Sequence, residues 1–240
     1  MNTVPDTAMV LAAGLGSRMR PLTETTAKPL LKVGGRRMIS YLLSMLAEVG
    51  VRRAVVNVHW FADDLETYLT KDHGVEIVIA DERSQLLETG GALAAARSLL
   101  GKDPIFVVNT DAFWAPADPA PLEALSRKFN AAEMDECLML ADIGRCLGYK
   151  GQGDFHLERN GLISRRRPSE QARWAYAGIR ILKPQLYDDS PVQPFSANRI
   201  WDQLLPRKRM TGLPLDRFWL HVGDPQALKD ADMWVRCHGT

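Results

Sequence analysis

Basic side chains are concentrated in a short stretch near the start of the chain, beginning at two closely spaced glycines, Gly14 and Gly16. From Gly14 to Arg37 there is one acidic residue, Glu24, against six basic ones, namely Arg18, Arg20, Lys28, Lys32, Arg36 and Arg37. The formal net charge of the whole chain is only +1, so this excess is local. The glycines let the backbone turn tightly and expose its N–H groups. Exposed amides and fixed cations both attract anions, so the stretch predicts a phosphate-binding loop.

Asp111 is a second candidate for chemistry, because it lies just after an apolar run at residues 105–108. Open α/β sheets bind their ligands at the carboxyl ends of strands. A carboxylate in that place suits Mg²⁺, which takes few protein oxygens and completes its shell with phosphates and water. The alternative is an aspartate that only caps the loop into Ala112 and Phe113.

Apolar runs alternate with helical patterns through the first half of the chain. We expect strands at residues 8–12, 54–58, 75–80 and 105–108. Between them we expect helices at residues 37–49, 61–69 and 89–100. Gly50 follows the first of these helices and suits the left-handed position at a helix end, and the third closes at Gly101. This rhythm predicts an α/β fold in which helices cover both faces of a parallel sheet.

The pattern changes after about residue 134. Strands are expected at residues 137–141, 155–158 and 174–182, joined by longer loops, and helices at 197–205 and 225–235. Asp224 precedes the last helix and should cap it. No repeat or linker divides the chain, so we expect a single domain over residues 1–240. Within it, residues 1–134 would bind one ligand and residues 135–240 would form the other wall of a cleft.

The composition excludes several classes of protein. With 46% hydrophobic and 25% charged residues, the chain is typical of a globular protein with a full core. A near-neutral charge disfavours nucleic acid or a membrane surface as the main partner. No apolar run reaches the roughly 20 residues that a membrane helix needs, and no signal peptide is visible. The three cysteines, Cys137, Cys146 and Cys237, fit reduced thiols, so we expect a cytoplasmic protein without a disulfide or zinc framework.

The glycine loop does not fit a dinucleotide-binding motif. Such a motif requires a third glycine near position 19 and an acid at the end of the second strand. Here position 19 is a methionine instead of glycine, and the second strand ends at Asn57, Val58 and His59 with no acid. A phosphate loop of the GxxxxGK[ST] type is also absent. Taken alone, the two glycines therefore remain compatible with an ordinary turn between a strand and a helix.

The longer pattern is much more specific. Gly14-Leu-Gly-Ser-Arg-Met-Arg-Pro-Leu-Thr23, followed by Lys28-Pro-Leu30, resembles the N-terminal motif of the sugar-1-phosphate nucleotidyltransferases. The resemblance continues in order along nearly the whole chain, through residues 87–91, 108–111, 153–155, 176–179 and 219–223. It implies a Rossmann-like, mixed but mostly parallel sheet flanked by helices, of the GT-A-like type.

The resemblance also implies a reaction, in which a sugar 1-phosphate attacks a nucleoside triphosphate to give a nucleoside-diphosphate sugar and pyrophosphate. The attacking phosphate oxygen is already an anion, so the protein must supply orientation and charge neutralisation rather than a base. By the resemblance, the catalytic residues are Arg18 over the leaving pyrophosphate, Lys28 between the two substrates, and Asp111 on the metal. The nucleotide-binding set is Leu11, Ala13, Gly14, Gly16, Ser17, Arg18, Lys28, Gln85 and Gly90, and the set that binds the other substrate is Glu88, Asn109, Asp154 and Gly178.

His221 departs from the family pattern. The family usually places a second metal-binding Asp in a Trp-Val-Asp-Val-Gly segment, whereas this chain has His221 there. Imidazole is a poorer ligand for Mg²⁺ than a carboxylate. His221 could still bind the metal, with Mn²⁺ as an alternative to Mg²⁺, or it could contact phosphate, or Asp111 and the substrates could hold the metal alone.

The substrates are less specified than the reaction. The chain is short, and its motifs are most similar to those of family members that use UTP and N-acetylmuramate 1-phosphate. The three arginines at 165–167 could reach the sugar phosphate or a lactyl carboxylate, or could form a solvated charged run. Guanylyl transfer to mannose or heptose 1-phosphate, cytidylyl transfer to phosphocholine, and a non-catalytic binding protein remain alternatives. A monomer or simple homodimer is expected.

Overall fold

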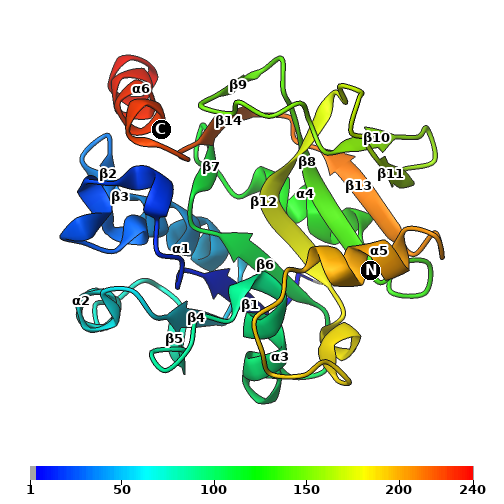
Figure 1. The fold of residues 1–240 in the computed structure, drawn as a ribbon, viewed down its shortest axis with the longest axis horizontal. Helices are drawn as coiled ribbons and strands as arrows, with labels where there is room; N and C mark the ends of the chain where they lie inside the picture. Colours follow the sequence, from blue (N-terminus) through cyan, green and yellow to red (C-terminus); the bar gives the residue numbers. More distant parts are fainter. Residues whose placement is uncertain (1–3, 240) are drawn as a thin grey trace.

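The computed structural model describes residues 4–239. Among these residues a nine-stranded sheet forms the centre of the molecule (Figure 1). Its parallel part runs in the order β6–β1–β4–β5, with β5 at the edge of the sheet. All four strands were expected from the sequence, and they occupy Thr7–Leu11 (β1), Arg53–Val58 (β4), Glu76–Asp81 (β5) and Ile105–Asn109 (β6).

The second half of the chain extends this sheet with strands of mixed direction. The long strand β12 (Trp174–Leu182) runs antiparallel to β6 on one side and to β8 (Glu136–Asp142) on the other. Beyond them lie β13 (Met210–Pro214), β10 (Phe155–Leu157) and β11 (Ile163–Arg165). The register of β12 against β8 shifts between Tyr176 and Arg180, where Gly178 has a φ of 87°. The predicted mixed sheet with a parallel core is therefore confirmed.

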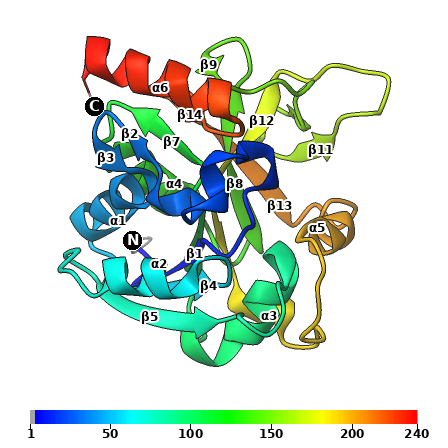
Figure 2. The same cartoon turned by 60° about the vertical axis from the view of Figure 1, so that its left-hand side comes forward.

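Helices cover the two faces of the sheet (Figure 2). One hydrophobic cluster contains residues of α1 (Met38–Val49), α2 (Ala62–Leu69) and α4 (Ala120–Lys128). The other contains residues of α3 (Glu88–Leu100) and α5 (Asn198–Leu204). No helix of the described residues is long and apolar enough to cross a membrane.

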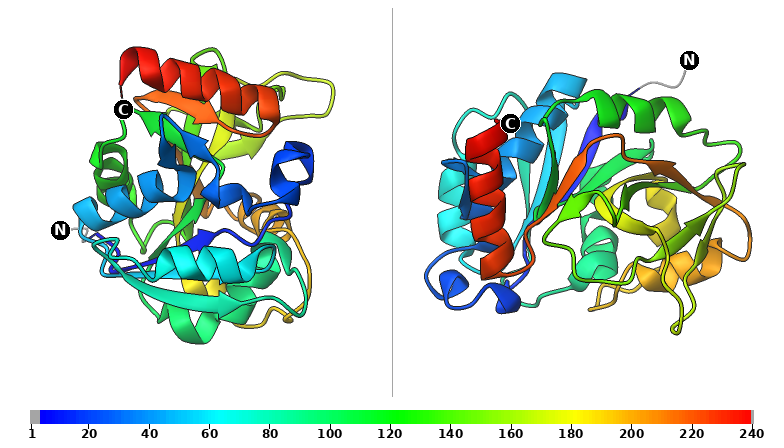
Figure 3. Two further views of the ribbon diagram at one scale, coloured as in Figure 1. Left: turned by 90° about the vertical axis from the view of Figure 1, so that its left-hand side faces the viewer. Right: turned by 90° about the horizontal axis from the view of Figure 1, so that it is seen from above.

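A small second sheet lies beside the main one and brings two distant segments together. In it β14 (Phe218–His221) pairs antiparallel with β7 (Ala112–Ala115) and parallel with β9 (Cys146–Leu147). The right-hand view of Figure 3 shows β14 in orange beside β7 in green. The register places His221 opposite Ala112, and the N–H of Val222 donates to the carbonyl of Asp111 over 2.8 Å. The residues after β6 and after β14 are thus fixed side by side.

The last helix, α6 (Pro225–His238), packs against the hairpin of β2 (Lys32–Val33) and β3 (Arg36–Arg37). Asp224 caps this helix as expected, because its Oδ1 accepts the Ala227 N–H at 2.9 Å. Further along α6, Asp232 accepts a hydrogen bond at 2.8 Å from the N–H of Gly34, in the turn between β2 and β3. This hairpin directly follows the glycine loop, so α6 fixes the segment into which the loop runs.

The sequence did not predict every element. Helix α4 was missed, because its start follows Pro119 and contains Pro121, which indicate a loop when read locally. Proline is tolerated in the first turn of a helix, where its missing N–H has no helical partner anyway. The short strands β7 and β14 were also missed, since they are defined only by their pairing with each other.

Candidate active site

The glycine loop connects β1 to β2 through three short 3₁₀ turns, at Ser17–Met19, Leu22–Glu24 and Lys28–Leu30. Gly16 has a φ of 61°, and a Cβ there would lie 2.7 Å from Cγ2 of Thr23, so only glycine fits. The Thr23 hydroxyl donates to the carbonyl of Gly16 at 2.8 Å, and the indole N–H of Trp60 donates to the carbonyl of Thr23 at 2.8 Å. The loop is therefore held in shape by bonds within the chain.

A cavity of about 440 Å³ opens above this loop; we call it the first cavity. Its lining contains seven of the residues expected to bind the nucleotide and three others expected in the site: Leu11, Ala13, Gly14, Gly16, Ser17, Arg18 and Lys28, with Glu88, Asn109 and Asp111. Glu88 is one of few non-glycine residues with a positive φ, 58°, and such backbone strain is typical of functional positions.

A second cavity, of about 390 Å³, adjoins the first. Its lining includes Asp154, Gly178 and His221, together with Arg165 and Arg180. It shares five residues with the first cavity, namely Arg18, Thr89, Asn109, Asp111 and Ser196. The two cavities therefore form one cleft with room for two ligands, and Asp111 lies where they meet.

Lys28 and Asp111 form an ion pair at this junction, with Nζ 3.0 Å from Oδ2. The side chain of Lys28 is 12% exposed and that of Asp111 is 27% exposed, so a ligand in the cleft can reach both. Burial is the largest single influence and acts to raise the pKa of Asp111, but the charges of Lys28 and its other neighbours, with the hydrogen bond from Lys28, together hold that pKa below its ordinary value. At neutral pH the junction thus holds one fixed negative and one fixed positive charge.

His221 lies against the aromatic rings of Tyr149 and Trp219, whose centroids are 5.9 and 5.3 Å from the centroid of its ring. Burial lowers the pKa of His221, and the negative charge of Asp111 offsets this only in part. The imidazole is therefore neutral at pH 7. Its Nδ1 is buried and has no hydrogen-bond partner among the described residues. Gly223 lies against this ring, where a Cβ would come within 2.7 Å of Cε1.

Among residues 4–239, no three His, Cys, Asp or Glu side chains lie together so that they could hold a metal ion. Two candidate ligands lie side by side in the site, the Asp111 carboxylate and the imidazole of His221, whose Nδ1 has no hydrogen-bond partner among residues 4–239. This set fits an ion such as Mg²⁺ whose remaining ligands are substrate phosphates and water. It does not fit a closed structural site, which needs about four protein ligands.

Comparison with known proteins identifies the family. The family model described as nucleotidyl transferase matches residues 7–149, which is more than half of the chain. The chain belongs to the nucleotidyl transferase family. The expected enzyme class and resemblance are thereby confirmed.

Two relatives match this nucleotidyl transferase over almost its whole length. The N-acetylmuramate alpha-1-phosphate uridylyltransferase of Caulobacter vibrioides is 43% identical, over 95% of this chain and 96% of the relative. The protein of the same name from Neisseria meningitidis serogroup B is 32% identical, over 93% of this chain and 96% of the relative. Among solved structures, the inositol-1-phosphate CTP transferase of T. maritima aligns with a TM-score of 0.78, at 19% identity, over 97% of this chain and 96% of that one. This last likeness shows the shared fold.

Two residues expected to bind the nucleotide, Gln85 and Gly90, do not line either cavity in the described part of the enzyme. The Gly90 N–H donates to the carbonyl of Phe195 at 2.8 Å, and a Cβ on Gly90 would lie 2.3 Å from the Phe195 ring. Gly90 thus allows the segment that carries Ser196 to approach α3. Roles for Gln85 and Gly90 in binding the nucleotide stay predictions.

Three residues of the cleft, Ser196, Arg180 and Asn57, were not among those expected from the sequence. Ser196 lines both cavities, but its place depends on a long-range contact in which Thr89 Oγ1 accepts the Ala197 N–H at 2.8 Å. Arg180 has no motif to mark it. Asn57 could have been found from the sequence, because it is a polar residue near the carboxyl end of the buried second strand.

The arginine run at 165–167 is divided by the fold. Arg165 lines the second cavity, where its Nε lies 2.8 Å from Oδ1 of Asp202 and its Nη2 lies 3.0 Å from Oδ1 of Asn198. Arg166 bonds to backbone carbonyls, including that of Gly153 at 2.9 Å. Only Arg165 is therefore placed to meet a ligand in the second cavity.

Proposed function

We propose that this nucleotidyl transferase transfers a uridylyl group from UTP to N-acetylmuramate 1-phosphate and releases pyrophosphate. The observation that carries the two-substrate part of this proposal is the Lys28–Asp111 pair at the meeting point of two cavities. The identity of the substrates is supported by the two uridylyltransferases that match the chain over almost its full length.

The first cavity suits the nucleotide and the second suits the sugar. The first contains the glycine loop, whose N–H groups and cations favour a triphosphate. The second contains Asp154 for a sugar hydroxyl and Arg165, whose charge complements the lactyl carboxylate of a muramate. In this assignment residues 1–134 supply most of the nucleotide site, and residues 135–240 supply most of the sugar site.

The reaction needs positioning and charge rather than a base. An oxygen of the sugar phosphate forms a bond to the α-phosphorus of UTP while the bond from that phosphorus to the pyrophosphate oxygen breaks. Arg18 lines both cavities, so its guanidinium can neutralise the leaving pyrophosphate. Lys28 holds an ammonium at the junction, where the two negatively charged phosphates must approach each other.

Asp111 and His221 are the residues that would hold Mg²⁺. The ion, when bound, would neutralise phosphate charge and act as a Lewis acid on the α-phosphate. We further propose a cytoplasmic enzyme, because Cys137, Cys146 and Cys237 are free thiols, as is typical of a reducing compartment. A monomer or simple homodimer accords with a cleft built from one chain.

Pyrophosphate release, measured for four nucleoside triphosphates against a panel of sugar 1-phosphates, tests the substrates. We expect the highest kcat/KM for UTP with N-acetylmuramate 1-phosphate. N-acetylglucosamine 1-phosphate is the matched control, since it lacks only the lactyl group. A higher kcat/KM for GTP with mannose 1-phosphate would contradict the assignment, and no release with any pair would favour a binding protein.

The metal assignment of His221 can be measured without turnover. Mn²⁺ bound to the enzyme–UTP complex is counted by electron paramagnetic resonance. We expect His221→Ala to weaken Mn²⁺ binding by about 10- to 100-fold, the range found when metal sites lose a supporting group. His221→Asp should retain binding and shift preference towards Mg²⁺, because a carboxylate is the harder ligand.

His73→Ala is the control for this measurement, because His73 contacts Tyr68 away from both cavities. An unchanged Mn²⁺ affinity in His221→Ala would show that His221 is not a metal ligand. The metal would then be held by Asp111 and the substrates alone.

A further inference from the structure

A chain of buried polar contacts joins two segments that line the first cavity, and one of its members, Asn57, lines that cavity too. The N–H of Ala12 donates to Oδ1 of Asn57 at 2.7 Å. The Nδ2 of Asn57 donates to Oε1 of Glu82 at 2.8 Å. The N–H of Leu87 donates to Oε2 of Glu82 at 3.1 Å. Asn57 and Glu82 are each only 3% exposed, so water does not compete for these bonds.

The two ends of this chain are backbone groups in opposite walls of the cavity. Ala12 belongs to the glycine loop and itself lines the cavity. Leu87 directly precedes α3, between Leu86 and Glu88, which both line the cavity. The two segments come from different strands of the sheet, so the side chains of Asn57 and Glu82 set the spacing between them.

The contacts require a carboxylate at position 82. Two donors, Asn57 Nδ2 and the Leu87 N–H, face the two oxygens of Glu82. A glutamine could accept only one of them, and its own NH₂ group would then face the other donor. Burial raises the pKa of Glu82 while these two bonds oppose the rise. A buried carboxylate is costly for the fold, so its use here points to a role that a neutral side chain cannot fill.

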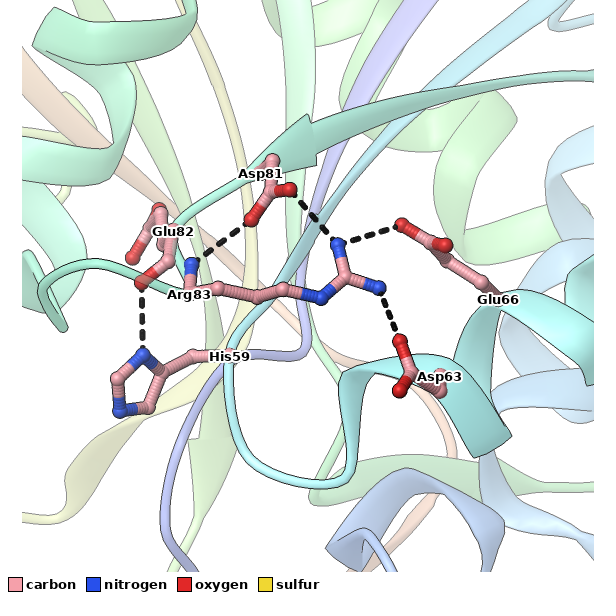
Figure 4. Close-up of polar contacts among 6 residues, drawn as sticks. All are labelled: His59, Asp63, Glu66, Asp81, Glu82 and Arg83. Carbon is pink, nitrogen blue, oxygen red and sulfur yellow. Dashed lines mark hydrogen bonds and ion pairs between the residues drawn. The ribbon is translucent and has the colours of Figure 1, made fainter.

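The backbone of Glu82 is fixed on both sides (Figure 4). Its carbonyl lies 2.7 Å from Nδ1 of His59, and its N–H donates to the carbonyl of Val58 at 2.9 Å. Arg83 points away from the carboxylate of Glu82 and bonds to three acids, Asp63 at 2.7 Å, Glu66 at 3.0 Å and Asp81 at 2.7 Å. Arg83 thus ties residue 82 to α2, and the carboxylate of Glu82 accepts hydrogen bonds from Asn57 and Leu87.

We propose that Asn57 and Glu82 are positioning residues that hold the glycine loop and the start of α3 at the spacing that binds the nucleoside triphosphate. The inference rests on the proposed assignment of the first cavity to the nucleotide. Neither residue takes part in the phosphoryl chemistry. Their loss therefore acts on nucleotide binding and leaves the second cavity unchanged.

The test compares binding of the two substrates in Glu82→Gln. We expect the KM for UTP, and the Kd for UTP measured by calorimetry, to rise about tenfold, as suits the loss of one hydrogen bond to a charged group. The KM for the sugar 1-phosphate should stay within about twofold, because its cavity does not contain residue 82. Equal rises in both KM values, or an unchanged KM for UTP, would overturn the proposal.

A second variant exchanges the polarity of the pair and keeps the experiment decisive if Glu82→Gln folds poorly. In Asn57→Asp/Glu82→Gln the aspartate accepts from Ala12 and from the glutamine NH₂, and the glutamine oxygen accepts from Leu87. All three hydrogen bonds are restored, and the negative charge moves from residue 82 to residue 57. We therefore expect the KM for UTP to return to within about threefold of the parent value. A KM for UTP in the double variant that is no lower than in Glu82→Gln would also overturn the proposal.

Asp81→Asn is the matched control. Asp81 is the neighbouring carboxylate, but it bonds to Arg83 at the surface, and its loss should leave the KM for UTP unchanged. The proposed function is tested separately by the parent enzyme, which would contradict it by showing a higher kcat/KM for another triphosphate than for UTP. The same variants are then measured with that triphosphate, and the expected rise in KM is the same.

Discussion

Lys28→Met should lower kcat for nucleotidyl transfer by about 10²- to 10³-fold, the usual loss when one preorganised charge at a reacting centre is removed. The ammonium of Lys28 lies at the junction of the two cavities, 3.0 Å from the carboxylate of Asp111. Its charge offsets the repulsion between two phosphates as they come together. Methionine keeps the apolar stem and removes only the charge. Steady-state pyrophosphate release at saturating substrates measures the effect, and circular dichroism checks the fold.

Two variants separate a role at the junction from a general loss of positive charge. Lys28→Arg keeps the charge but spreads it over a planar guanidinium, so we expect a smaller loss than in Lys28→Met. Lys32→Met removes an exposed lysine four residues away and should change kcat less than twofold. If Lys28→Met kept more than a tenth of the parent kcat, Lys28 would not be part of the catalytic machinery.

Arg180→Met should reduce the free energy of unfolding by about 3–5 kcal/mol, the range found when one partner of a buried ion pair is removed. Arg180 is 1% exposed and Glu136 is not exposed at all, and Nε of the arginine lies 2.9 Å from Oε1 of the glutamate. Without Arg180, the carboxylate of Glu136 is buried, and its one remaining donor among residues 4–239 is the indole N–H of Trp201, at 2.8 Å. Urea unfolding followed by tryptophan fluorescence measures the loss.

Removing both charges should restore most of this stability. In Glu136→Gln/Arg180→Met no buried charge is left, and the glutamine oxygen can still accept from Trp201. Arg173→Met is the control, because Arg173 pairs with Asp142 at the surface and should cost less than about 1 kcal/mol. A double variant no more stable than Arg180→Met would show that packing of the arginine stem, rather than charge, accounts for the loss.

The parts of the site that are local in sequence could be predicted from it. Gly16 needs a backbone conformation that only glycine adopts easily, and Lys28 follows in the same loop. Asp111 and Asp154 occupy motif positions, and the structure places both in the lining of the second cavity. His221 was marked by its departure from a family segment, and the pairing of β14 with β7 places it beside Asp111.

The remaining groups depend on contacts that no local pattern encodes. Ser196 reaches the cleft because Phe195 packs on Gly90, and Arg180 enters it because β12 crosses between β6 and β8. Glu82 lies in a stretch that looks like a polar loop, yet the fold buries its side chain against Asn57. Tertiary pairing, rather than propensity, decides the surroundings of such residues.

The bonds that hold the glycine loop have a consequence for the energetics of binding. The carbonyl of Gly16 accepts from Met19 and from the Thr23 hydroxyl, and Trp60 fixes Thr23 in turn. Since all of these partners belong to the chain, the conformational entropy of the loop is lost during folding and not when a nucleotide arrives. The free energy of each phosphate contact is then available for affinity, which is the advantage of a preorganised site.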